Sequence, residues 1–153
     1  MSKFALKTIE AVCGNQVFKQ LVVLKNNVNA DKIQNEINIK EAKNEEVNIE
    51  GQLDIYENKM EAKYERSLNS IYTIMNMVAN LRGLADTQFR DITPSKEIIK
   101  EYEFKSGDLR VYAIKALNGK IIILGGYKNE QDKNIVEFRA LKRMYLQSIN
   151  NKK

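Results

Sequence analysis

Apolar and polar residues alternate at the start of the chain, and a period of two is typical of a strand with one buried face. Residues 4–12 read FALKTIEAV, and a second apolar stretch covers residues 17–24. Between them Gly14-Asn15 can form a turn. We expect a strand over the first stretch and a strand or a short helix over the second.

The middle of the chain changes to a helical period. Residues 25–52 are rich in Asn, Lys and Glu, so we expect them to be the least core-like part and a surface insertion. Apolar residues then recur at spacings of three and four, which predicts a long helix with one stripe in the core. The stripe consists of Leu53, Tyr56, Met60, Tyr64, Leu68, Ile71, Met75 and Val78. Arg82 and Gly83 are expected to end this helix, since glycine readily adopts the left-handed cap, and a polar connector follows over residues 86–95.

Three strand signals come next at close spacing. Residues 98–105 alternate aromatic with charged side chains, which predicts a strand with one solvated face. Residues 109–115 and 120–124 are joined through Asn118-Gly119, the strongest short hairpin signal. The apolar run in the last stretch predicts a strand covered on both faces. The charged positions of the first stretch are Glu101, Glu103 and Lys105.

A basic helix is expected to close the chain. Gly125-Gly126 is expected to turn the backbone out of the sheet, and Asp132 to cap a helix that runs to about Ile149. On this helix Arg139 and Arg143 share a flank that can reach the edge of the sheet. Its inward-facing residues are expected to be Ile135, Phe138, Leu141 and Tyr145.

These elements predict a single domain over residues 1–153 of the α+β class. The expected sheet is small and antiparallel, with the N-terminal strand and a C-terminal three-stranded meander. A long helix precedes the meander and a basic helix follows it. A chain of 153 residues is long enough for one hydrophobic core.

The net charge of +5 is concentrated in the C-terminal part. Residues 1–95 hold 12 Lys and Arg against 13 Asp and Glu, a net of −1, whereas residues 96–153 hold 13 against 7, a net of +6. A local basic field favours an anionic partner, and RNA is the first candidate. The alternative is a basic tail that only solubilises the chain.

Several kinds of chemistry are disfavoured by composition. The chain has no histidine and a single cysteine, Cys13, so zinc ligation, histidine-centred catalysis and an internal disulfide are not expected. Cys13 is expected to be a small buried hydrophobe. No apolar run approaches the ~20 residues of a membrane span, and the N-terminus lacks the pattern of a secretory signal. We therefore expect a cytoplasmic protein, in which any metal-dependent chemistry would have to use carboxylates alone.

The C-terminal third resembles the RelE/ParE superfamily of toxins from bacterial toxin-antitoxin systems, and within it the HigB-like branch. Residues 102–112 read YEFKSGDLRVY and enter the Asn-Gly hairpin, and residues 123–128 read ILGGYK before a cationic helix. The resemblance covers about residues 68–150, is weaker over residues 1–25 and is absent over about 26–60, where this chain carries extra length. The helix contributes Phe138, Arg139, Lys142 and Arg143 to the likeness.

The resemblance implies a toxin that enters the ribosome, cleaves translated mRNA and is held inactive by a cognate antitoxin. Such an endoribonuclease uses neither metal nor cofactor, and a ribose 2′-hydroxyl attacks the adjacent phosphate. The reaction needs a base for the hydroxyl proton, cations for the charge on the phosphorane and an acid for the leaving oxygen. Arginine suits the second task because its planar fork meets two phosphate oxygens and stays charged.

Candidate roles follow from matching positions. Arg110 matches the family's strand arginine and is the expected contact to the scissile phosphate, unless it is only a surface cation paired with Glu103. Lys128 is the expected second cation and Lys105 a candidate base. Tyr145 lies near a C-terminal tyrosine that some members use in catalysis, although its inward phase also fits core packing. The residues expected to bind nucleic acid are Arg139, Arg143, Lys142 and Lys133, each of which could instead be a solvated helix residue.

One departure from the family leaves the function open. Some family members carry lysines on the strand before the arginine, where this chain has Glu101 and Glu103. Either glutamate is a candidate general base if burial raises its pKa, or the pair is only the solvated face of the strand. A ParE-like inhibitor of DNA gyrase and a non-catalytic RNA-binding or partner-binding protein therefore remain alternatives.

Overall fold

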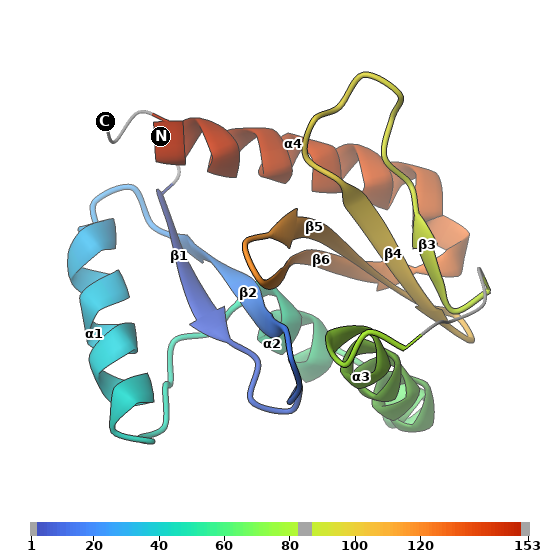
Figure 1. The fold of residues 1–153 in the computed structure, drawn as a ribbon, viewed down its shortest axis with the longest axis horizontal. Coiled ribbons are helices and arrows are strands. Elements are labelled where there is room, and N and C mark those ends of the chain that lie inside the picture. The colour runs from blue at the N-terminus through green and yellow to red at the C-terminus, as the bar shows by residue number, and fades with distance from the viewer. Residues whose placement is uncertain (1–2, 83–86, 151–153) are drawn as a thin grey trace.

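Strands from both ends of the chain build one six-stranded sheet (Figure 1). The computed structural model describes residues 3–82 and 87–150. The strand order is β1-β2-β6-β5-β4-β3, and every neighbouring pair is antiparallel except β2 and β6, which are parallel. The strands are β1 (Lys3–Thr8), β2 (Val17–Leu24), β3 (Phe89–Asp91), β4 (Glu101–Ser106), β5 (Leu109–Ala116) and β6 (Gly119–Tyr127).

The predicted α+β class and the C-terminal meander are confirmed, but the expected antiparallel sheet of four strands is wrong. β3 was missed because its three residues lie in a stretch that reads as a polar connector. The segment at residues 17–24 forms a strand rather than a short helix. The chain between β2 and β6 crosses over through helices and the meander, and this long connection allows the two strands to pair in parallel.

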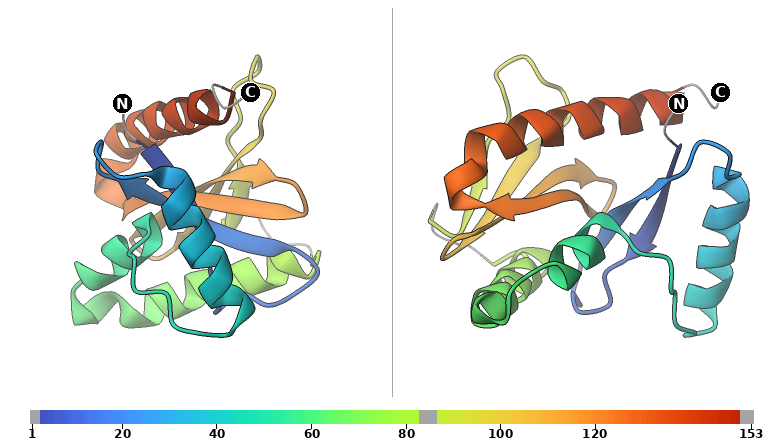
Figure 2. Two further views of the ribbon diagram at one scale, coloured as in Figure 1. Left: turned by 90° about the vertical axis from the view of Figure 1, so that its left-hand side faces the viewer. Right: turned by 180° about the vertical axis from the view of Figure 1, so that it is seen from behind.

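Helices cover both faces of this sheet (Figures 1 and 2). α2 (Gln52–Asn58) and α3 (Glu65–Ala79) lie on one face, and α4 (Gln131–Asn150) crosses the other. α1 (Ala30–Ala42) lies beside β1 at the edge. Two short 3₁₀ turns, η1 (Ala62–Tyr64) and η2 (Lys128–Glu130), precede α3 and α4. No described helix combines the length and the apolar character that crossing a membrane would require.

The single long helix expected from Leu53 to Val78 is wrong, because a turn divides it into α2 and α3. The apolar stripe survives the break, since Leu53, Ile71 and Met75 are at most 1% exposed and share one core cluster. α3 ends at Ala79, and Leu81 takes the left-handed conformation with φ 61°. The expected cap at Gly83 lies outside the described residues.

Each face of β6 enters a different core layer, which confirms that this strand is covered on both sides. Ile122 packs in the cluster under α2 and α3, whereas Ile123 packs in the cluster under α4. The expected turn at Gly125-Gly126 is wrong, since β6 continues through both glycines. A Cβ atom at Gly125 would collide with the Tyr56 ring, and one at Gly126 with the Asn134 side chain. The glycines therefore allow a close approach from the helices rather than a change of direction.

The segment over residues 25–52, expected to be a surface insertion, forms α1 and reaches only the first residue of α2. Of α1 only Ile37 is fully buried, and Ile33 packs beside it against the same small cluster. Polar side chains of α1 also reach the edge of the sheet. The Leu6 N–H donates to Gln34 at 2.7 Å, and the Thr8 N–H donates to Glu41 at 2.8 Å. These bonds occupy backbone groups that an open edge would offer to another strand.

The closing helix has the predicted inward face. Phe138 is fully buried, Tyr145 is 8% exposed, and Ile135 and Leu141 pack against the same cluster. Asp132 lies inside the first turn of α4 rather than at its cap. Cys13 is exposed, so the expectation that it is buried is wrong.

Candidate functional site

Arg110 occupies the α4 side of β5 at the end of the sheet. Its side chain is largely buried, and Nη1 donates to the carbonyls of Gly107 and Leu109, both at 2.8 Å. The buried Nε has no hydrogen-bond partner. The alternative of an exposed cation paired with Glu103 is wrong, because the Arg110 guanidinium is held by the β4–β5 turn. Glu103 pairs with Arg90 and Gln131 instead.

Lys105 and Tyr112 lie next to Arg110 on the same face. Lys105 is directly opposite Arg110 on β4, and residues in that relation share a face. Tyr112 is two residues further along β5, fully buried, and its hydroxyl has no partner. Buried polar atoms without partners are rare in folded proteins. Two of them on neighbouring side chains mark this corner of the sheet as a candidate site.

The solvated face expected for β4 is wrong at both glutamates. Glu103 is fully buried and accepts from Arg90 at 3.2 Å and from Gln131 at 2.6 Å. Burial raises the pKa of Tyr112, and the Glu103 carboxylate opposite it raises this pKa further. Arg90 and Gln131 were missed in the sequence, because one lies in the polar connector and the other in the first turn of α4.

Glu101 is 1% exposed and holds α4 to the sheet. It accepts from Arg139 Nε at 2.9 Å and from Lys142 Nζ at 2.8 Å. Lys142 also donates to the Ile99 carbonyl at 2.9 Å, and its side chain is 4% exposed. The expectation that Lys142 binds nucleic acid is therefore wrong for this conformation. Arg139 is partly exposed, but its guanidinium is engaged by Glu101 and by the carbonyl of Ile92.

The remaining candidates are distributed over two regions. Lys128 is exposed in η2, and its N–H donates to the Asp108 carbonyl at 2.8 Å, which brings it to the same end of the sheet as Arg110. Lys133 and Arg143 are exposed on α4. Tyr145 packs edge-on against Phe4 at 6.0 Å, so its interpretation as a core residue is confirmed.

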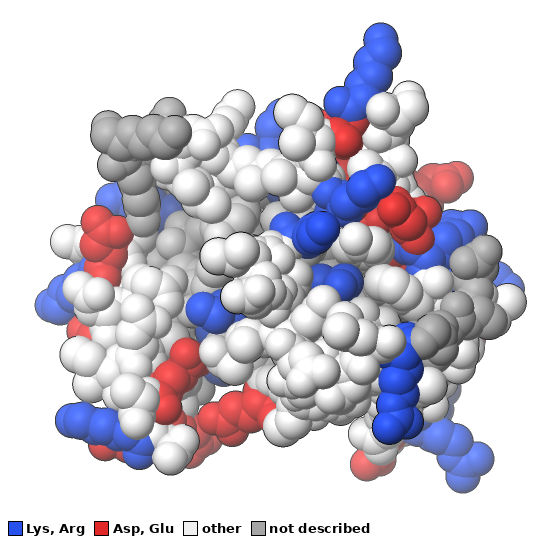
Figure 3. Space-filling view, in the orientation of Figure 1, with Lys and Arg blue, Asp and Glu red and all other residues white. Residues whose placement is uncertain are grey.

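The expected single cluster of cations is thus divided. One group contains Lys105, Arg110 and Lys128 near the β4–β5 turn, and the other surrounds Glu101. Along β4 the two groups are separated by about 13 Å, four residues at ~3.3 Å each. On the face drawn in Figure 3, acidic and basic side chains are interspersed rather than segregated.

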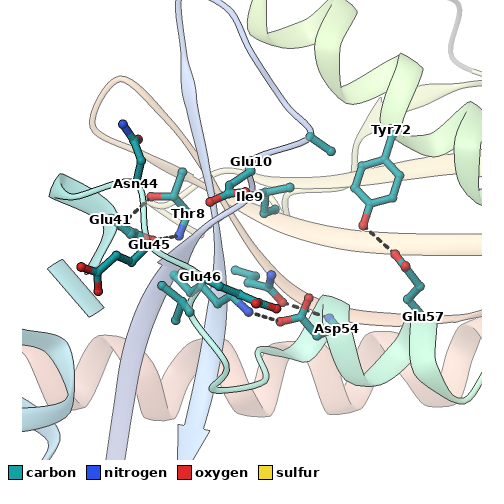
Figure 4. A pocket seen from close by; sticks show the side chains of 14 residues that line it. Thr8, Ile9, Glu10, Glu41, Asn44, Glu45, Glu46, Asp54, Glu57 and Tyr72 are labelled. Atoms are coloured by element: carbon teal, nitrogen blue, oxygen red, sulfur yellow. Dashed lines mark hydrogen bonds and ion pairs between the residues drawn. The ribbon is translucent and has the colours of Figure 1, made fainter. Parts of the chain in front are cut away.

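An acidic pocket of about 420 Å³ lies away from these cations, between α1, α2 and the β1–β2 hairpin (Figure 4). Burial acts to raise the pKa of Asp54, but its hydrogen bonds, foremost that from Lys7 at 2.6 Å, leave this pKa below its usual value. Glu57 accepts from the Tyr72 hydroxyl at 2.9 Å. Within residues 3–82 and 87–150, no three acidic or cysteine side chains come together as metal ligands would. A surface of this charge disfavours an anionic ligand such as RNA.

Lys120 is a buried cation that the sequence analysis did not single out. Its ammonium lies 4.8 Å from the centre of the Tyr102 ring and 5.7 Å from those of Phe18 and Phe89. Burial lowers the pKa of Lys120, and the charge of Lys115 lowers it further. The aromatic rings stabilise the ammonium form, so this side chain serves the packing at the opposite end of β5 and β6.

No family model, curated protein or solved structure matches this chain. The likeness to RelE/ParE toxins therefore stays a prediction. The function is argued below from the chemistry of the Arg110 region.

Tyr112→Phe is expected to leave stability unchanged or to raise it by about 1 kcal/mol. The substitution removes a buried hydroxyl that has no partner and keeps the ring that stacks on Phe138. Urea unfolding of both proteins measures the difference. A loss of more than about 1 kcal/mol would mean that the hydroxyl is hydrogen-bonded in solution, with the Glu103 carboxylate across the strand pair as the acceptor.

Proposed function

We propose that this protein is an endoribonuclease of the RelE/ParE toxin kind, which cleaves mRNA on the ribosome. The observation that carries the proposal is the Arg110 guanidinium, fixed at the end of the sheet with a buried Nε that has no partner. Lys105 lies directly across the strand pair, and Lys128 lies beyond the adjoining turn. A phosphodiester at this corner would meet cations from two strands and from η2.

The proposed reaction divides three tasks among these residues. Lys105 takes the proton from the ribose 2′-hydroxyl, whose oxygen then attacks the neighbouring phosphorus. Arg110 stabilises the charge that builds on the phosphorane oxygens. Lys128 returns a proton to the departing 5′-oxygen. Glu103 has no exposed surface and is paired with Arg90, so its part is to position the strand rather than to act as the base.

Regulation is proposed to come from a cognate antitoxin that covers Arg110 and α4. The outer side of α4 carries Val136 and Met144, which are 72% and 40% exposed, beside the cations Lys133 and Arg143. A partner segment with apolar and acidic side chains complements this surface. Copurification from a strain that expresses the neighbouring genes would recover this partner.

Inhibition of DNA gyrase is the second candidate, and one observation favours it. The two glutamates that could have supplied an exposed carboxylate base are buried and paired, and inhibition by binding needs no base. Double-strand breaks with intact messages after induction would select this function.

Growth after induction tests the proposal, with Arg110→Ala compared with the wild type and with Arg82→Ala, an exposed arginine three residues after the end of α3. The wild type and Arg82→Ala are expected to arrest growth, with message ends mapped inside reading frames. Loss of one electrostatic contact to the phosphorane is expected to lower cleavage by Arg110→Ala roughly 100- to 1,000-fold. Purified Arg110→Ala must give the circular dichroism spectrum of the wild type. Unchanged cleavage by this folded variant would remove Arg110 from the mechanism.

A further inference from the structure

A cavity of about 600 Å³ opens at the end of the sheet, on the side of α2 and α3. It lies where η1 and η2 meet the turn between β4 and β5. Its lining includes Lys59, Tyr64, Asp108, Tyr127, Lys128 and Asn129. Asp108 is two residues before Arg110, so the cavity adjoins the proposed cleavage site around the end of the strand pair.

Tyrosine rings form one wall of this cavity. The centres of the Tyr64 and Tyr127 rings are 5.2 Å apart, and the planes are inclined by 52°. The centre of the Tyr56 ring lies 5.7 Å from that of Tyr127, and the Tyr56 hydroxyl donates to the Gly126 carbonyl at 2.6 Å. Burial raises the pKa of Tyr127, and Tyr64 raises it further, so the ring stays uncharged at neutral pH. The wall is therefore aromatic, neutral and held in place before any ligand arrives.

Charges at the rim are arranged so that two ammonium groups remain available. Glu61 and Glu130 also line the cavity, but they pair with Lys63 at 3.7 Å and with Lys133 at 3.9 Å. Lys59 and Lys128, by contrast, form no ion pair with any residue in the described part of the chain. The cavity thus combines an aromatic wall with cations at its rim.

We propose that this cavity binds one base of single-stranded RNA next to the cleaved phosphodiester, an inference that rests on the proposed function. Every nucleobase has a π-face that stacks on an aromatic side chain, and cations beside it meet the flanking phosphates. The Asp108 carboxylate accepts from exocyclic amino groups, and the Asn129 amide both donates and accepts. The ligand is thus a nucleotide whose base enters the cavity while its phosphate faces Lys59 or Lys128.

Equilibrium binding of a fluorescent, 2′-O-methylated RNA oligonucleotide tests this inference, because the methyl groups block cleavage. Tyr64→Leu and Tyr127→Leu are expected to weaken binding roughly tenfold each, as the loss of one stacked base does. Tyr72→Leu is the matched control, since Tyr72 is a half-buried tyrosine of α3 outside this cavity. An abasic nucleotide at the bound position should weaken binding by the wild type and have little further effect on Tyr64→Leu.

Lys59→Gln keeps the inference testable if a tyrosine variant does not fold, because Lys59 is exposed. It should reduce the slope of log K against log salt by about 0.7, the value for one phosphate contact with a single strand, whereas Lys43→Gln on the end of α1 should not. Equal binding by all variants, or no binding by the wild type, would overturn the base site. Neither result decides the nuclease proposal, which is tested separately by message cleavage in cells.

Discussion

Replacing Lys142 by methionine is expected to lower the free energy of unfolding by about 3–5 kcal/mol, the usual cost of removing one partner from a buried ion pair. The Lys142 ammonium lies 2.8 Å from Glu101, and both side chains are at most 4% exposed. Methionine fills most of the same volume but leaves the Glu101 carboxylate with Arg139 alone. Urea unfolding followed by circular dichroism measures the change.

Two variants separate charge from packing in this experiment. Arg143→Met, on the exposed side of the same helix, is expected to change stability by less than about 0.5 kcal/mol. Combining Lys142→Met with Glu101→Gln should recover much of the loss, because no buried carboxylate is left without its partner. A double variant as unstable as Lys142→Met alone would show that the loss comes from packing rather than from the ion pair.

Phe138→Ala is expected to cost about 3–5 kcal/mol, the range for truncating a fully buried aromatic ring. Phe138 has no exposed surface and stacks on Tyr112 with ring centres 5.5 Å apart. The truncation opens a cavity between α4 and β5 at the level of the proposed site, so α4 loses its central contact. The shift of the urea midpoint at unchanged slope measures the cost.

Val136→Ala is the control on the same helix, and because Val136 is 72% exposed its replacement should change stability by less than about 0.5 kcal/mol. Phe138→Leu should cost less than Phe138→Ala, since more of the volume is kept. Equal stability of Phe138→Ala and the wild type would contradict the packing of α4 on the sheet.

Signals that are local in sequence predicted the meander and the closing helix. The alternation before Arg110, the Asn118-Gly119 turn and the spacing of apolar residues on α4 each act within a few residues, and each element formed. The strand order could not be predicted in this way. β2 meets β6 through pairs such as Val17 with Gly119, and no local pattern carries that information.

The candidate site was predicted only in part, for a related reason. Arg110, Lys105 and Lys128 were identified by resemblance and do lie at one end of the sheet. The burial and the pairing of Glu101 and Lys142 depend on where α4 crosses β4. The period-two pattern of a strand carries no information about that crossing. A glutamate that alternates with aromatic residues in a strand is normally expected to be exposed to solvent. Glu101 is buried because Lys142, from a helix distant in the sequence, pairs with it.

The parallel pairing of β2 with β6 has a consequence for biosynthesis. At 5–20 residues per second the ribosome needs roughly 5–20 s to proceed from Leu24 to Gly119. During that interval β2 is paired with β1 alone, because β6, its second neighbour in the finished sheet, has not been synthesised. The chain cannot complete its fold until its last quarter has been translated, so the Arg110 corner is assembled only as synthesis ends.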